Sequence, residues 1–99
     1  YIHLAGVFAC NFVNHLFVEA NDILAKQNID FSVLSPLITE TVQKAIETSP
    51  FEAQTGPAIR HDENIIQKHL NLLDYEKQKE LYLCISNLIK EKHKNNDKL

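Results

Sequence analysis

Apolar residues recur at helical spacing along most of the chain, and this pattern predicts an all-α protein. Positions i, i+3, i+4 and i+7 are repeatedly apolar, whereas no pair of segments has the alternation typical of β-strands. The predicted helices cover about residues 3–26, 35–49, 63–73 and 75–92. With 99 residues, the chain is long enough for one modest core. We therefore expect a compact bundle of about four main helices, with residues 1–92 forming one domain.

Polar residues and breakers mark the expected ends of these helices. Asp30, Ser32 and Ser35 are candidate caps for the second helix, so the pattern leaves its start open. Asp62 is expected to be the structural cap of the third helix. From about Lys90 the chain is rich in charge and poor in apolar residues, so residues 93–99 are predicted to form a frayed or disordered tail.

The first predicted helix is mostly apolar, but polar side chains gather on one side of it. At about 100° per residue, a single arc of roughly 120° measured from His3 contains Val7, Asn11, Asn14, His15, Val18, Asn21 and Asp22. The other sides are apolar, so we expect neighbours on most faces of this helix. The polar groups either line a cleft, or they bond to loop backbone within the domain or face solvent.

The irregular backbone is concentrated in residues 54–62. Gly56 permits a positive φ and Pro57 fixes a turn, while Thr55 adds a hydroxyl group. Arg60 stands just before the third helix, where free amides and the helix dipole favour anions. A carboxylate or phosphate would fit this loop.

An ordinary structural role for the same loop stays open. Arg60 could pair with Asp62, with Glu63 or with a carboxylate on another helix, and Asp62 could do no more than cap.

Composition excludes several classes of function. The formal charge of −3 and the scattered lysines leave no footprint for nucleic acid. Asn11, Asn14 and His15 argue against a membrane span through the first helix, and neither a metal site nor a Gly-rich dinucleotide motif occurs in the sequence. Cys10 and Cys84 have no disulfide or metal spacing, so we expect reduced core thiols in a cytoplasmic protein.

The chain opens at Tyr1 inside an apolar helical pattern and contains no methionine. A complete translation product should begin with methionine. We therefore expect that the chain is cut from a longer protein and that a partner domain lies upstream.

Four segments carry a resemblance to a known family. They are His3–Leu16, Pro36–Thr41, Gln54–Asp62 and Lys68–Leu70. In this order they resemble the C-terminal helical domain, domain of unknown function 2520, of bacterial two-domain proteins whose N-terminal half is an NADP-oxidoreductase-type Rossmann domain. The resemblance extends to about Ile89, and the loop pattern Thr-Gly-Pro, then Arg, then Asp is its most specific part.

The resemblance implies a domain similar to the C-terminal domain of 6-phosphogluconate dehydrogenase. In that plan NADP or NAD is bound mainly by the absent Rossmann domain and not by this chain, while the helical domain contacts a small anionic substrate and builds a homodimer. The implied catalytic residues are His3, Asn11 and Asn14, and the implied substrate-binding residues are Thr55, Gly56, Arg60 and His15. The first helix has no lysine before Lys26, so the Lys-plus-Asn proton relay of hydroxyacid dehydrogenases does not carry over.

Two functions therefore remain at this point. The first is a substrate-binding and dimerisation domain of an NAD(P)-dependent oxidoreductase, inactive without its cofactor domain. The second is a free-standing helical interaction module without catalytic activity. A site formed jointly by the polar side of the first helix and the Arg60 loop would favour the first.

Overall fold

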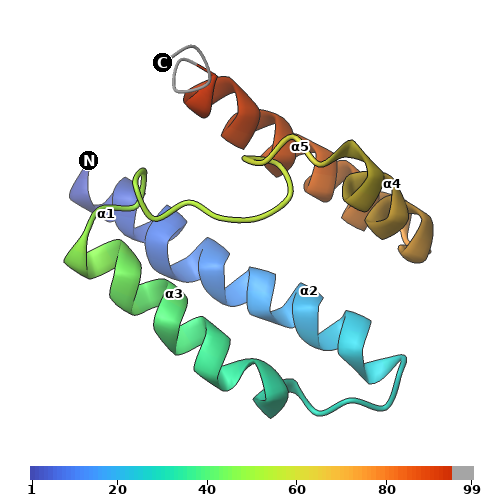
Figure 1. Cartoon of the computed structure of the whole chain (residues 1–99). Coiled ribbons are helices and arrows are strands. Elements are labelled where there is room, and N and C mark those ends of the chain that lie inside the picture. Colours follow the sequence, from blue (N-terminus) through green and yellow to red (C-terminus); the bar gives the residue numbers. More distant parts are fainter. Residues whose placement is uncertain (95–99) are drawn as a thin grey trace. The chain divides into compact units, whose positions relative to one another are not determined.

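The computed structural model describes residues 1–94, and every regular element in that range is helical. The elements are α1 (Ile2–Gly6), η1 (Val7–Phe12), α2 (Val13–Ala25), η2 (Phe31–Leu34), α3 (Ser35–Glu47), α4 (Glu63–Leu72) and α5 (Glu76–His93) (Figure 1). The all-α prediction with four main helices is confirmed, because α1, η1 and α2 follow one another as one helix. The chain divides into two compact units, Tyr1–Thr41 and Val42–Leu99.

The first helix, Ile2–Ala25, ends in a Schellman-type cap. Asn28 has a left-handed φ of 57°. Its amide donates to the carbonyl of Ala25 at 3.0 Å, and the amide of Ile29 donates to the carbonyl of Leu24 at 3.1 Å. Asparagine tolerates this conformation better than most residues, which explains why the helix stops in the polar run that follows Lys26.

A π-helical segment of six residues, η1, interrupts this helix. Its hydrogen bonds reach one residue further than those of an α-helix, so the segment takes up one extra residue. One residue corresponds to about 100° of rotation. The predicted single polar arc is therefore wrong, because positions before Val7 and after Phe12 do not follow one α-helical progression.

The start of α3 is fixed by a short 3₁₀ turn. The Asp30 side chain accepts a hydrogen bond from the Ser32 amide at 2.8 Å and caps η2. Hydrogen bonds from Ser32, from its side chain first and then from its backbone, hold the pKa of Asp30 below its usual value. Ser35 then begins α3, with Pro36 in the first turn where its missing amide costs nothing.

Side-chain contacts join α4 to α5 in the second unit. His69 Nδ1 lies 2.8 Å from the hydroxyl of Tyr82, and Lys90 Nζ donates to Glu63 Oε1 at 2.7 Å. The predicted cap is confirmed, because Asp62 Oδ1 accepts a hydrogen bond from the Ile65 amide at 3.3 Å.

The end of α5 differs from its prediction. The helix continues through His93, although residues from Lys90 onward were expected to fray and residue 93 was assigned to the tail. His93 is only 7% exposed and stacks on Phe51 with ring centroids 4.1 Å apart, which holds the last turn in place. The rest of the predicted tail, residues 95–99, lies outside the described residues.

Little of the described chain is buried, and this overturns three expectations. Only Ala58, Ile66, Gln78 and His93 are buried among residues 1–94. The first helix buries no residue, although we expected neighbours on most of its faces. Cys10 and Cys84 are exposed and not core thiols. The apolar spacing within the predicted helix 75–92 indicates a buried face formed by Leu81, Tyr82, Ile85, Leu88 and Ile89. In the structure Ile85 and Leu88 are exposed and the others are half-buried.

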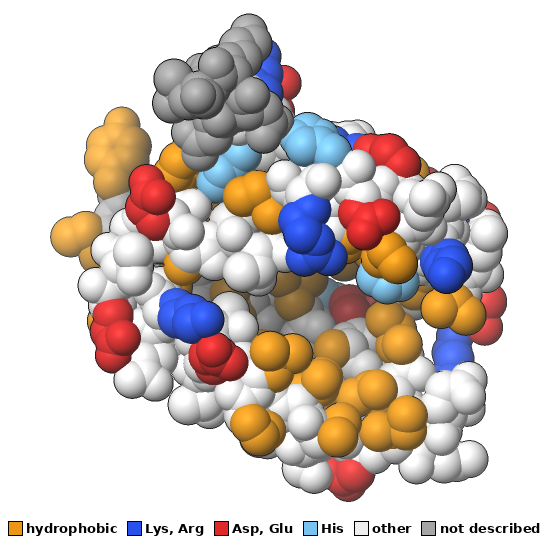
Figure 2. All heavy atoms as spheres, viewed as in Figure 1, with side chains coloured by type: hydrophobic (Ala, Val, Ile, Leu, Met, Phe, Trp, Pro, Cys, Tyr) orange, Lys and Arg blue, Asp and Glu red, His pale blue; other side chains and the backbone are white. Residues whose placement is uncertain are grey.

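The physical reason is that many apolar side chains are only partly covered by the other residues from 1 to 94. Leu4 is 58% exposed, Phe8 62% and Phe12 50%, and Figure 2 shows hydrophobic side chains open to solvent on the face it presents. By length and composition alone, the first helix would also be able to cross a membrane. The core helix of a soluble protein can pass the same test, and polar residues such as Asn14 and His15 are those that hydrocarbon disfavours.

Candidate functional site

Polar residues of the first helix form the first part of the candidate site. His3, Asn11, Asn14 and His15 are all exposed. No hydrogen bond engages the side chain of Asn11 or Asn14 within residues 1–94. His15 is different, because its Nε2 lies 2.7 Å from Glu19 Oε2 one turn further along α2. A ligand that used His15 would therefore compete with Glu19.

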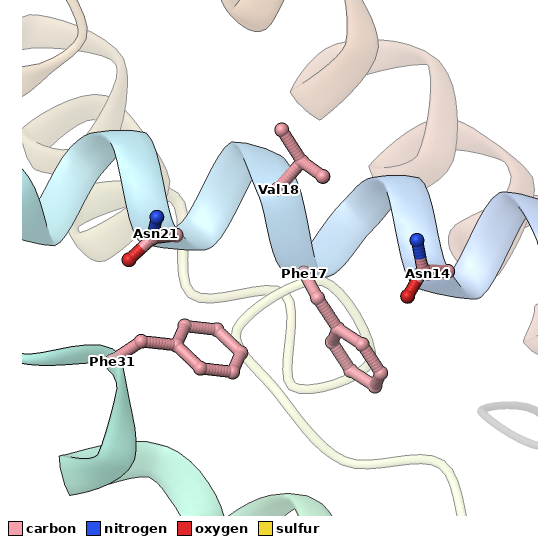
Figure 3. A pocket seen from close by; sticks show the side chains of 5 residues that line it. All are labelled: Asn14, Phe17, Val18, Asn21 and Phe31. Atoms are coloured by element: carbon pink, nitrogen blue, oxygen red, sulfur yellow. The ribbon is translucent and has the colours of Figure 1, made fainter.

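Asn14 borders a pocket in the first unit. The pocket has a volume of about 240 Å³ and is lined by Asn14, Phe17, Val18, Asn21 and Phe31 (Figure 3). Four of these residues stand at i, i+3, i+4 and i+7 along α2 and share one side of it, while Phe31 comes from η2. The rings of Phe17 and Phe31 meet edge to face with centroids 6.0 Å apart.

The sequence predicted only one member of this pocket, Asn14, as a functional residue. Phe17 and Phe31 were missed, since each fits an ordinary core position. A signal was nevertheless present, because Phe17 is three residues from Asn14 and four from Asn21, so all three lie on one side of an α-helix.

Residues 54–62 form the second part of the candidate site and are folded by their own hydrogen bonds. The Asp62 amide donates to the Pro57 carbonyl at 2.9 Å, and the His61 amide donates to the Ala58 carbonyl at 3.1 Å. Gly56 adopts a φ of 105° and His61 a φ of 54°, so two residues of this short loop have positive φ. Ala58, in the middle of this loop, is buried with 4% exposure.

The guanidinium of Arg60 is exposed, and it makes no ion pair or hydrogen bond with any residue from 1 to 94. The alternative pairing with Asp62 or Glu63 does not occur: the carboxylate of Asp62 caps α4, and that of Glu63 lies against Lys90 at 2.7 Å. Thr55 is also exposed. The loop therefore offers an available cation beside a helix N-terminus.

The two parts of the candidate site belong to different units. His3, Asn11, Asn14 and His15 lie in Tyr1–Thr41, and Thr55, Gly56 and Arg60 lie in Val42–Leu99. Within the first unit, the structure brings Asn14 together with the pocket, whereas His3 lies about three turns away along the helix. A joint site of the two units stays a prediction. Residues 1–94 contain no group of three or more His, Cys, Asp or Glu side chains that could hold a metal ion.

Residues 1–94 are helical in every regular element, expose apolar helix faces and leave the side chains of Asn11, Asn14 and Arg60 without partners in that range. These are features of a domain that works against a partner. The chain belongs to the family described as domain of unknown function DUF2520, which matches residues 1–89. This family is the one indicated by the sequence segments above.

A crystal structure from Bacteroides fragilis, named as that of a "putative NADP oxidoreductase", is similar to this chain over most of its length. The two are 49% identical and superpose with a TM-score of 0.87 over 91% of this chain. The chain spans 35% of the length of that protein. No curated protein matches this chain.

Proposed function

We propose that the chain is the C-terminal substrate-binding and dimerisation domain of a cytoplasmic NAD(P)-dependent oxidoreductase that acts on a small anionic substrate. One observation carries the proposal: the chain is 49% identical to about a third of a protein named for NADP oxidoreduction. A separate N-terminal Rossmann domain would bind most of the cofactor, as the family resemblance implies.

The free polar groups support a role at the wall of a substrate cleft. Asn11 and Asn14 carry carboxamides that both donate and accept hydrogen bonds, and neither is used within the described chain. His3 carries an imidazole, the side chain used most often in general acid–base catalysis. When bound, the nicotinamide supplies or accepts the hydride, and this chain's residues would orient the substrate and move the proton.

The unpaired Arg60 supports recognition of an anion. A guanidinium can hold a carboxylate or a phosphate with two parallel hydrogen bonds, and Thr55 and the backbone at Gly56 would complete the contact. Lys90 and Glu63 satisfy each other nearby, so they leave the charge of Arg60 uncompensated. In this proposal Arg60 fixes the anionic end of the substrate.

The exposed apolar side of the first helix supports dimerisation. Leu4, Phe8 and Phe12 stand four residues apart and each is at least half exposed. A second copy can cover such a stripe with its own stripe across a two-fold axis, as most soluble homodimers do. The same exposure is the observation in favour of the second candidate function, a helical interaction module without catalysis.

Cofactor binding and turnover by the full-length protein separate the two functions. We expect NADPH to bind and to be oxidised with small carbonyl compounds that carry a carboxylate or a phosphate. Arg60→Gln should raise KM at least tenfold while leaving the Kd for NADPH unchanged. Lys68→Gln, a change of another exposed cation in the middle of α4, is the matched control and should leave KM unchanged.

Two results would contradict this proposal. Failure of the full-length protein to bind either NADPH or NADH would leave the interaction module as the better explanation. A large loss of stability in Arg60→Gln, without a change in KM, would assign Arg60 a structural role.

A further inference from the structure

The pocket beside Asn14 has features that describe a ligand more closely than "small anion". Its volume is about 240 Å³. The pocket is a depression open to solvent over most of its extent, and one six-membered ring with a substituent can lie in it.

Its walls select for a flat apolar group. Phe17 and Phe31 contribute two rings inclined at 61° to each other, and both rings are only half-buried by the chain itself. Edge-to-face and offset stacking favour a further aromatic ring against such a pair. Val18 adds an aliphatic contact.

The polar groups of the pocket select for an uncharged ligand. None of the five lining residues carries a charge, and an ion without a partner is costly to remove from water. Asn14 and Asn21 are separated by two turns, about 10.5 Å along the helix, and Figure 3 shows them on either side of Phe17. Each carboxamide can donate and accept, and neither has a hydrogen-bond partner within residues 1–94.

We infer that this pocket binds an uncharged aromatic ring carrying an amide or a hydroxyl group, and that this ring is part of the substrate. Calling it substrate rests on the proposed function, whereas ring binding itself does not.

Benzamide is the probe that tests the pocket. It is added to isotope-labelled full-length protein, and the side-chain amide signals of Asn14 and Asn21 are followed by NMR. We expect both signals to shift and to saturate at millimolar benzamide. Benzoate, its charged analogue, and cyclohexanecarboxamide, its non-aromatic analogue, should each bind at least tenfold more weakly.

Variants assign the site. Phe31→Ala should weaken benzamide binding at least tenfold, and Val33→Ala, which changes an exposed residue of the same 3₁₀ turn outside the pocket, should not change it. Since Phe31→Ala removes a packing contact and could unfold the unit, Asn21→Leu provides a second variant at an exposed position, with the same expected loss.

The remaining comparison separates the substrate from the cofactor, whose nicotinamide is also a ring with a carboxamide. Benzamide should still bind when the protein is saturated with NADP⁺. Competition by NADP⁺ would overturn the assignment of the ring to the substrate. Absence of any NMR shift, or equal binding of benzoate, would overturn the inference that the pocket binds an uncharged aromatic ring. Failure of the protein to bind NADP⁺ or NADPH would contradict the proposed function while leaving the benzamide result to stand on its own.

Discussion

His69 Nδ1 and the phenol oxygen of Tyr82 lie 2.8 Å apart, and this hydrogen bond links α4 with α5. Their rings also meet edge to face, with centroids 5.8 Å apart. Tyr82→Phe keeps the ring and removes the bond, so we expect the free energy of unfolding to fall by about 1 kcal/mol. Urea unfolding measures this change. Tyr75→Phe, at an exposed tyrosine without this partner, should be neutral, and equal effects of the two variants would mean that the hydrogen bond adds nothing.

The same tyrosine gives the protein a pH-dependent contribution to stability. Burial raises the pKa of Tyr82 above its ordinary value of 10.0, and the nearby charge of Lys90 opposes this shift. Because the folded state disfavours the ionised phenol, the contribution is complete below pH 10.0 and is lost as the pH rises through the folded-state pKa. Titration of tyrosinate absorbance in the wild type and in Tyr82→Phe isolates this group. A difference curve with its midpoint at or below pH 10.0 would contradict the burial effect.

The cap at Asp62 should contribute measurable stability. Asp62→Ala removes the acceptor of the Ile65 amide, and we expect a loss of about 1 kcal/mol in urea unfolding. Asp62→Asn keeps a side-chain oxygen at the same place and should recover most of the loss, since asparagine caps about as well as aspartate. If Asn is as damaging as Ala, the negative charge and not the cap is responsible.

The two glycines should respond to alanine in opposite directions. Gly56 has a φ of 105°, so Gly56→Ala forces a side chain into a conformation that L-residues avoid, and it should cost about 1 to 3 kcal/mol. Gly6 is helical and an added methyl group meets nothing within 4 Å, so Gly6→Ala should stabilise by up to about 1 kcal/mol. Thermal unfolding of both variants checks the signs. A stabilising Gly56→Ala would mean that the loop leaves its positive φ at little cost.

Self-association should depend on the apolar stripe of the first helix. Phe12→Lys places a charge in that stripe, and we expect the dissociation constant of the proposed dimer to rise at least tenfold in analytical ultracentrifugation. Leu72→Lys, on α4 and 81% exposed, is the control for adding a lysine to an apolar surface position. If Leu72→Lys dissociates the dimer and Phe12→Lys does not, the interface lies on α4 and not on the first helix. A wild type that stays monomeric at every concentration would contradict the dimer.

Much of the fold follows from the sequence, because helical periodicity and caps are local properties. The cap at Asp62 is one example. The face that α5 buries was not predictable in this way: Gln78 and His93 are buried, whereas Leu88, which fits the apolar pattern, is exposed. Apolar residues recur on every face of a helix that packs against something, including faces that pack against partners outside the chain.

The candidate site was predictable in its residue types but not in its geometry. The sequence indicated that Arg60 could bind an anion or pair internally. Within residues 1–94 the structure shows no internal pair, because Glu63 lies against Lys90 and Asp62 caps α4, while anion binding stays a prediction. The pocket beside Asn14 needs Phe31 from a different element, and that contact depends on the turn after the first helix. The π-helical segment has no strong sequence signature, so the polar arc was assigned with a uniform 100° per residue and did not account for the extra residue.

That segment has a consequence for how related sequences are compared. A helix that holds one extra residue between Val7 and Phe12 can lose it and become α-helical throughout, and the side chains from Val13 onward would then regain their alignment with those before Gly6. Homologues whose first helix is regular should therefore show a one-residue gap at this point. Alignments that forbid the gap would match Asn14 to a neighbour of its true counterpart.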